Sequence, residues 1–239
     1  MSESVSVLIC TRNHLSSLQT TLRTVGKVDV PTNCQVELIV VDNGSTDGTR
    51  SWVEQTSLPN MPVRLVEEPR VGQARARNRS LGAARGDILL FTDDDVRLPS
   101  NWLRAMTRPL ASGQADAVRG KSVLHPSRKR PWMRAFHRAV LAVTVGIKEE
   151  GQHTMKGLSM GFTRRVLQQV PAFDPELGPG TPYGYFDDTL FSYQVVEAGF
   201  HIAAVLEAPV VHQPDAERLS RKAYCRAAAC RGRGLTYID

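Results

Sequence analysis

Near-continuous runs of valine, isoleucine and leucine alternate with helical patterns over the first hundred residues. A strand this apolar is buried on both faces, which is typical of a parallel sheet with helices on each side. We predict strands at residues 5–10, 35–42, 63–68 and 87–93, and helices at residues 14–25, from about residue 47, and at residues 72–86. The chain should therefore adopt an α/β fold with a mostly parallel central sheet flanked by helices.

The second half of the chain has a weaker pattern. We expect helices at residues 102–111, near residues 131–145 and at 189–198, a strand at 157–162, a strand pair around 201–211, and a basic C-terminal helix. Neither an internal repeat nor a low-complexity linker occurs. Residues 1–239 should therefore form a single domain with two halves, residues 1–97 and 98–239.

Composition and charge narrow the class of protein. No apolar run approaches the roughly 20 residues that a transmembrane helix requires, and residues 1–10 lack the basic segment of a signal peptide. We therefore expect a soluble, cytoplasmic protein. The formal net charge is +6, with much of the excess in residues 125–138 and 217–234. This favours a polyanionic partner: nucleic acid, an anionic membrane face or a phosphorylated small molecule.

Polar residues follow three of the predicted strands at the point where each strand ends. Thr11 follows the first strand, Asp42 ends the second, and Asp93, Asp94 and Asp95 end the fourth. Ligands of open α/β sheets bind at the carboxyl ends of the strands. Carboxylate oxygens there suit a divalent cation that carries a phosphorylated ligand, and the cation would offset the repulsion among three neighbouring aspartates.

An isolated aspartate triplet has a simpler explanation, which is an exposed acidic turn before a helix capped by Ser100. The position of the triplet at the end of a buried strand, with Asp42 expected alongside, favours ligand binding instead. The segment "DNGSTDGT" also contains a turn and a helix cap at residues 45–49, which leaves Asp42 available for a ligand.

Four segments together resemble the inverting family 2 glycosyltransferases with the GT-A fold. They are "VSVLICTRNH", "ELIVVDNGSTDGT", "ARNRSLGAARGDILLFTDDDV" and "FDPELGPGTPYGYFDD", in the order and spacing of that family. The resemblance covers roughly residues 5–212. It implies that residues 1–97 form a nucleotide-binding half and residues 98–239 an acceptor-binding half.

The resemblance also implies roles for single residues of the donor site. Asp42 would bind the base of a uracil-type nucleotide, with Thr11 and Arg12 close to the base pocket. Arg77 would help to hold the nucleotide, and a solvated helix face is the alternative for it. In the "DxD" motif Asp93 would lie near the ribose, with Asp94 next to it. Two further residues would hold Mg²⁺ or Mn²⁺: Asp95, the last carboxylate of the motif, and His212, which follows a short apolar strand.

Inversion in a single displacement requires a general base on the acceptor side. The resemblance assigns this role to Asp188, the second of a pair of aspartates at a predicted helix start. Helix capping is the alternative, because carboxylates are favourable at helix N-termini. Two departures from the family pattern concern acceptor positioning: Asp187 stands where a glutamate is usual, and Gln194 where an arginine is common.

The resemblance therefore predicts a metal-dependent, inverting glycosyltransferase of the hexosyltransferase type that uses a nucleoside-diphosphate sugar. Bacterial relatives often build polysaccharides or glycolipids, which implies a glycan or glycolipid acceptor. A sugar-phosphate nucleotidyltransferase is one alternative, although "CTRNHLSS" lacks its glycine-rich phosphate loop. A non-enzymatic protein that binds nucleic acid through the basic segments is another. No recognised motif supports the latter, so we expect no nucleic-acid partner.

Three interpretations of the basic C-terminus remain open. Arg231 and Arg233 could form a flexible, glycine-hinged loop that closes over the diphosphate. Alternatively, Arg218, Arg221, Lys222 and Arg226 could rest on the inner face of a membrane, with Leu219, Ala223 and Ala227 opposite them. A solvated helix is the third interpretation.

Overall fold

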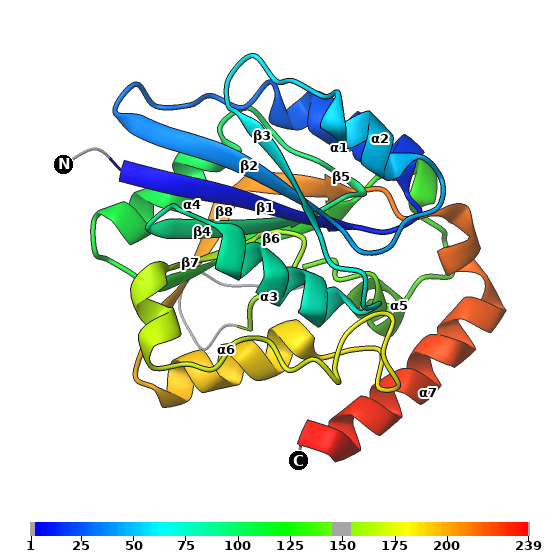
Figure 1. The fold of residues 1–239 in the computed structure, drawn as a ribbon. Helices are drawn as coiled ribbons and strands as arrows, with labels where there is room; N and C mark the ends of the chain where they lie inside the picture. Colours follow the sequence, from blue (N-terminus) through cyan, green and yellow to red (C-terminus); the bar gives the residue numbers. More distant parts are fainter. Residues whose placement is uncertain (1–2, 145–153, 239) are drawn as a thin grey trace.

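The computed structural model describes residues 3–144 and 154–238 and contains one mixed sheet between two layers of helices (Figure 1). Among the described residues the sheet has eight strands in the order β3-β2-β1-β4-β7-β6-β8-β5. The predicted α/β fold is confirmed. Strands β7 and β5 run antiparallel to the strands they pair with. The pairings of β1, β2, β3 and β4 with one another are parallel, as is the β6–β8 pairing.

The first half of the chain has the elements that its sequence predicts. Its elements are β1 (Glu3–Thr11), α1 (Leu15–Val25), β2 (Cys34–Asp42), α2 (Thr49–Glu54), β3 (Val63–Glu67), α3 (Gln73–Ala83) and β4 (Ile88–Asp93). The strands pair in register, and Thr11 lies opposite Asp42 while Cys10 lies opposite Asp93. The polar residues that follow these strands are therefore brought to one edge of the sheet.

The second half completes the sheet and adds the C-terminal helix. The short β5 (Val96–Arg97) ends the first half. The elements of the second half are α4 (Trp102–Ala111), β6 (Ala117–Leu124), α5 (Ala135–Val140), β7 (Met160–Thr163), α6 (Asp187–Glu197), β8 (Ile202–His212) and α7 (Arg221–Ile238), with short 3₁₀ turns at Pro126–Arg128, Arg164–Gln168 and Ala216–Leu219. Because β7 pairs with both β4 and β6, the two halves share one sheet.

Three predictions for this half are corrected. Strand β6 was not predicted, because its sequence "AVRGKSVL" is interrupted by charges and by Gly120. Gly120 is needed there, since a Cβ at this position would lie 2.0 Å from the hydroxyl of Ser159. The predicted strand pair is a single strand, β8, and the basic helix near residues 131–145 is only the short α5. Residue 145 lies outside the described residues.

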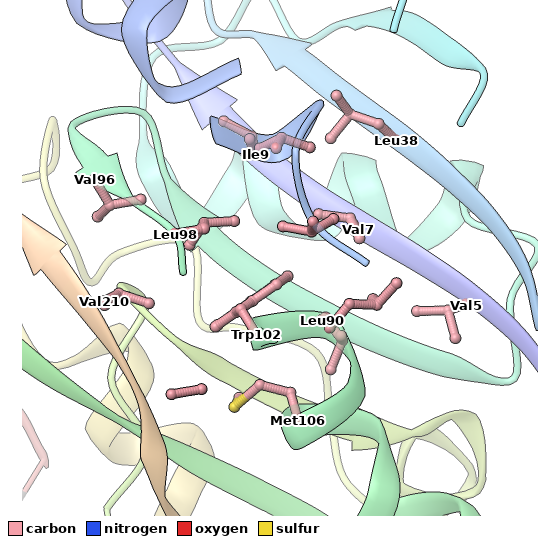
Figure 2. Packing of buried hydrophobic residues seen from close by; sticks show 14 of the residues in the cluster. Val5, Val7, Ile9, Leu38, Leu90, Val96, Leu98, Trp102, Met106 and Val210 are labelled. Atoms are coloured by element: carbon pink, nitrogen blue, oxygen red, sulfur yellow. The ribbon is translucent and has the colours of Figure 1, made fainter. Parts of the chain in front are cut away.

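Apolar residues of the central strands alternate between two cores. Val5, Val7 and Ile9 of β1 face the layer formed by α1, α2 and α4, where Trp102 and Met106 pack against Leu90 (Figure 2). Residues between them, such as Leu8, face α3 and α6, where Phe91, Phe162, Phe173 and Phe191 pack together. Burial on both faces fixes the register of the sheet.

Within the described residues, no helix is long and apolar enough to cross a membrane. Helix α7 is continuous through Arg231 and Arg233, so the interpretation of this segment as a flexible hinged loop is wrong. Leu219 and Ala227 are buried against the protein, with exposed fractions of 7% each. The apolar face that was considered for membrane contact therefore packs on the domain instead.

Candidate active site at the carboxyl ends of the strands

A cavity of about 490 Å³ opens at the edge of the sheet where β1, β2 and β4 end. It is lined by side chains from both halves of the chain. The lining residues are Cys10, Thr11, Arg12, His14, Asn43, Val71, Gln73, Ala76, Asp93, Asp94, Asp95, Pro179, Gly180, Gly184, Tyr185 and Arg218. Five of the predicted donor-site residues, Thr11, Arg12 and the three aspartates, are among them.

Asp94 is held by residues from the end of β1. The hydroxyl of Thr11 donates a hydrogen bond to Asp94 over 2.6 Å, and His14 Nδ1 donates to its other oxygen over 3.0 Å. His14 Nε2 lies 3.1 Å from Asp215, so both ring nitrogens face carboxylates and both must be donors. The hydrogen bond to Asp94 raises the pKa of His14 to about 9. The sequence did not single out His14.

Asp95 faces His212, as the predicted metal pair requires. The imidazole Nε2 lies 3.0 Å from Asp95 Oδ2, and Arg218 lies 3.4 Å from the same oxygen. Both Asp95 and His212 are almost fully buried. Burial alone would raise the pKa of Asp95, but its electrostatic and hydrogen-bond interactions with His212, and the charge of Arg218, outweigh burial and hold the pKa at about 2.

The donor set of this pair fits a divalent cation. His212 Nδ1 lies 2.8 Å from the carbonyl of Leu141 and must donate to it. In the neutral ring the lone pair is therefore on Nε2, the nitrogen that faces Asp95, and that nitrogen could bind a metal. A carboxylate and an oriented imidazole are ligands that Mn²⁺ accepts, and Mg²⁺ favours the carboxylate. No group of three or more His, Cys, Asp or Glu side chains forms a metal site in the described residues.

Asp42 does not line the cavity and is only 5% exposed. Its carboxylate accepts a hydrogen bond from the backbone of Ser45 over 3.2 Å. The neighbouring Asn43 lines the cavity instead, and its amide is fixed by the carbonyls of Glu68 and Arg70 and by the N–H of Gly72. Contact between Asp42 and a nucleotide base stays a prediction.

Arg77 is buried, with an exposed fraction of 3%, so its alternative placement on a solvated helix face is wrong. Its guanidinium forms an ion pair with Asp187 and lies 3.8 Å from Asp93. It also packs over the ring of Phe173. Arg77 is not among the residues that line the cavity. Through its contacts with Asp93 and Asp187, it connects the donor cavity with the start of α6.

Asp188 lies in the first turn of α6 and is partly exposed, at 16% of its side chain. Lys156 Nζ lies 3.3 Å from its Oδ1, and the N–H of Gly157 donates to Oδ2 over 3.2 Å. Burial opposes the ionised form, but the charges of Lys156 and Arg77 outweigh it and lower the pKa of Asp188. Asp188 is therefore ionised at neutral pH, as a general base must be.

Gly157 leaves no room for a side chain beside this network. A Cβ at this position would lie 1.8 Å from Arg77 Nη2 and 3.4 Å from Asp93 Oδ1. We expect Gly157→Ala to lower the free energy of unfolding by about 1–3 kcal/mol, because the buried guanidinium must move. Thermal unfolding monitored by circular dichroism measures this loss.

Gly82→Ala is the matched control. Gly82 lies in α3, and a Cβ there would meet nothing within 4 Å. The added methyl group should stabilise the helix by up to about 1 kcal/mol. Equal unfolding temperatures for Gly157→Ala and the native chain would show that Arg77 is not held as tightly as described.

Helix α7 fixes the glycine-rich loop at residues 178–186 that forms one wall of the cavity. Arg231 packs over the rings of Tyr185 and Phe186, at 5.6 and 4.9 Å from their centroids. The rings of Tyr183 and Tyr237 pack in a tilted arrangement, with centroids 4.3 Å apart. Phe186, which immediately precedes α6, has a left-handed backbone (φ 74°), so contacts of this kind are needed to hold it.

The sequence and the fold were compared with those of known proteins. The family model described as "Glycosyl transferase family 2" matches residues 6–170. The succinoglycan biosynthesis protein ExoM of Rhizobium meliloti is 32% identical over 138 residues, and the glycosyltransferase AglE of Haloferax volcanii is 33% identical over 118 residues. The matches cover 56% and 48% of this chain and 44% and 38% of those relatives, so they span less than half the length of either relative.

Solved structures share the fold. A mannosyltransferase of Pyrobaculum calidifontis, in complex with GDP-Man and Mn²⁺, superimposes with a TM-score of 0.70 at 24% identity, over 98% of this chain and 62% of that one. TarS residues 1–349 of S. aureus with UDP-GlcNAc gives 0.66 at 18% identity, over 95% and 66%. The family match extends over more than half of the chain, and these neighbours have the GT-A fold. The chain therefore belongs to glycosyl transferase family 2.

Proposed function

We propose that the protein is a metal-dependent, inverting glycosyltransferase that moves a hexosyl group from a nucleoside-diphosphate sugar to an acceptor hydroxyl. The observation that carries this proposal is the cavity that Asp93, Asp94 and Asp95 share with Thr11 and Arg12. The family of the chain supports glycosyl transfer over the alternative of a nucleotidyltransferase. The proposed location of this enzyme is the cytoplasm.

In this proposal the end of the sheet in residues 1–97 binds the nucleotide. Thr11, Arg12 and Asp42 hold the base, Asp93 and Asp94 lie at the ribose, and Arg77 acts through Asp93. UDP is the expected nucleotide. The neighbours with GDP-Man and with UDP-GlcNAc have this fold in common, so the base has to be determined by experiment.

Asp95 and His212 would hold Mg²⁺ or Mn²⁺. When bound, the cation supplies positive charge where the departing diphosphate gathers negative charge. Arg218 reaches the same cavity and already contacts Asp95, so this side chain can add a second positive charge beside a phosphate. The hydrogen bond from His212 to Leu141 fixes the tautomer that metal binding requires.

Residues 98–239 bind the acceptor in this proposal, which is a glycan or glycolipid hydroxyl. Asp188 removes the proton of that hydroxyl as it attacks the sugar from the face opposite the diphosphate. Lys156 now occupies one oxygen of Asp188 and would be displaced or would stay as a positioning partner. Inversion is checked by the anomeric configuration of the product, which proton NMR assigns.

Isothermal titration with a panel of nucleoside diphosphates, with and without Mn²⁺, tests the donor site. We expect one diphosphate to bind, and to bind more tightly with Mn²⁺. The reason is that the diphosphate would supply oxygen ligands to the cation held by Asp95 and His212. The matching monophosphate is the control and should show little metal dependence. If the folded protein binds none of the diphosphates, the proposal is wrong.

A further inference from the structure

Two large aromatic side chains are exposed on one side of the molecule, beside an apolar groove. Trp132 and Phe136 are 46% and 47% exposed. The groove has a volume of about 540 Å³ and is lined by Trp132, His137, Arg221, Tyr224 and Cys225. It lies between the segment that leads into α5 and the first turns of α7, which pack against each other (Figure 1).

The two segments that line this groove carry exposed cations that have no acidic partner among the described residues. Residues 125–138 and 221–238 contain no aspartate or glutamate. Besides Arg233, which lies further along α7, these two segments contain six exposed cations, and none of the six forms an ion pair with any described residue: Lys129, Arg134, Arg138, Arg221, Lys222 and Arg226. We call these six residues, with Trp132, Phe136 and the groove, the α5/α7 surface.

This combination fits an anionic lipid bilayer. Tryptophan is favoured at the level of lipid headgroups, where its ring meets hydrocarbon and its N–H meets water. Unpaired Lys and Arg side chains are attracted to anionic headgroups. The apolar wall of the groove suits hydrocarbon, whereas nucleotide bases, the alternative polyanionic partner, need hydrogen-bonding groups at their edges.

The α5/α7 surface is connected to the donor cavity. Tyr185 lines that cavity and also packs against Val140 of α5 and Tyr224 of α7. Arg218 lines the cavity and lies in the turn directly before α7. A bilayer on this surface would therefore contact the two helices that pack against Tyr185, one of the residues that line the donor cavity.

We infer that the α5/α7 surface docks the protein on an anionic lipid bilayer, with Trp132 and Phe136 at headgroup depth and the six cations over the headgroups. This contact uses the outer face of α7, whereas Leu219 and Ala227 face inward. Because vesicle binding needs no nucleotide sugar, its outcome is independent of the proposed transfer reaction.

Co-sedimentation of the native chain with vesicles tests the inference. Vesicles of phosphatidylcholine with a minority of phosphatidylglycerol should bind the protein, and pure phosphatidylcholine should bind it far less. The triple variant Arg134→Gln, Arg138→Gln, Lys222→Gln should bind about a hundredfold less tightly, since each cation near an anionic surface contributes about a factor of five. The control Arg23→Gln, Lys27→Gln, Arg85→Gln removes the same charge from exposed residues elsewhere and should bind as the native chain does.

Fluorescence gives a second readout. The chain has three tryptophans, and Trp102 is fully buried. Emission should shift to shorter wavelength on anionic vesicles, and Trp132→Phe should abolish the shift. Tyr193→Ser on α6, where Tyr193 is 50% exposed, is the control and should leave both readouts unchanged.

Three outcomes would overturn the inference. One is a native chain that stays in solution with anionic vesicles. Another is equal loss of binding in the two triple variants, which would indicate non-specific attraction by net charge. The third is tight binding of a single-stranded oligonucleotide by the native chain, lost in the first triple variant, with no binding to vesicles.

Discussion

Replacing Asp188 with asparagine should lower kcat by about 10²- to 10⁴-fold, the usual effect of losing a general base. Asparagine has the same size and still accepts hydrogen bonds from Lys156 and Gly157, so the start of α6 should remain intact. Affinity for the donor should change by less than about twofold, because Asp188 does not line the donor cavity. Steady-state kinetics and titration of the nucleoside diphosphate measure the two effects separately.

The pH dependence of the native enzyme supplies a further check on the same residue. The pKa of Asp188 is lowered from its ordinary value of 3.8, so its carboxylate stays ionised as the pH falls to about 4. Protonation of Asp188 should therefore reduce kcat/KM only below that pH.

Asp187→Asn is the matched control for Asp188→Asn. Asp187 forms a buried ion pair with Arg77, and its loss leaves this buried cation with only the more distant carboxylate of Asp93, at 3.8 Å. This variant should lose about 3–5 kcal/mol of stability and unfold at a lower temperature. If Asp188→Asn also unfolds early, or retains native kcat, then Asp188 is a helix cap and not the base.

Replacing Asp95 with asparagine should abolish the effect of Mn²⁺ on nucleotide affinity. In the variant, the dissociation constant of the nucleotide without Mn²⁺, divided by that with Mn²⁺, should be about one. In the native chain this ratio should be at least about 10 to 100, because loss of even an outer partner of a metal ligand usually costs that factor. The asparagine amide can donate to His212 Nε2, which preserves the buried contact that Asp95 makes now. Calorimetric titration in both conditions measures this ratio.

Asp94→Asn is the control within the same triplet. Asp94 is bound by Thr11 and His14 rather than by His212. This variant should bind nucleotide more weakly at every metal concentration but should keep the Mn²⁺ ratio of the native chain. A ratio that survives in Asp95→Asn would assign the cation to other ligands.

Much of the donor site was predictable because it follows from the ends of strands. The runs that end at Thr11, Asp42 and Asp93 are apolar enough to identify parallel strands, and parallel strands must bring their carboxyl ends to one edge. The cavity does open at that edge, between Thr11 and Asp95. The family resemblance assigned His212 to the metal site, and His212 does face Asp95.

Other residues of the site could not be read from the sequence, because their partners are distant along the chain. His14 and Asp215 are separated by 201 positions, and Arg77 and Asp187 by 110. Arg77 looked like a residue that binds nucleotide or faces solvent, and only the packing of α3 against α6 shows it buried and paired. Nothing local predicts that Asn43 rather than Asp42 lines the cavity.

Strand β6 and helix α7 are two further elements whose structure depends on contacts that the sequence does not reveal. The polar interruptions of β6 hide a strand that only its neighbours β7 and β8 complete. The basic, glycine-containing sequence of α7 allowed a flexible loop, a helix resting on a membrane face or a solvated helix, and its contacts with Tyr185 and Phe186 exclude the flexible loop.

The sequence by itself determined the α/β class, the order of the first elements and the cluster of carboxylates, since these depend on periodicity and on strand ends. The tertiary structure alone decided which of the charged residues are paired in the interior and which are left unpaired on the surface. The reason is physical: the free energy of a charged side chain depends on its burial and on the partners within a few ångströms, and both are set by contacts between segments far apart in the chain.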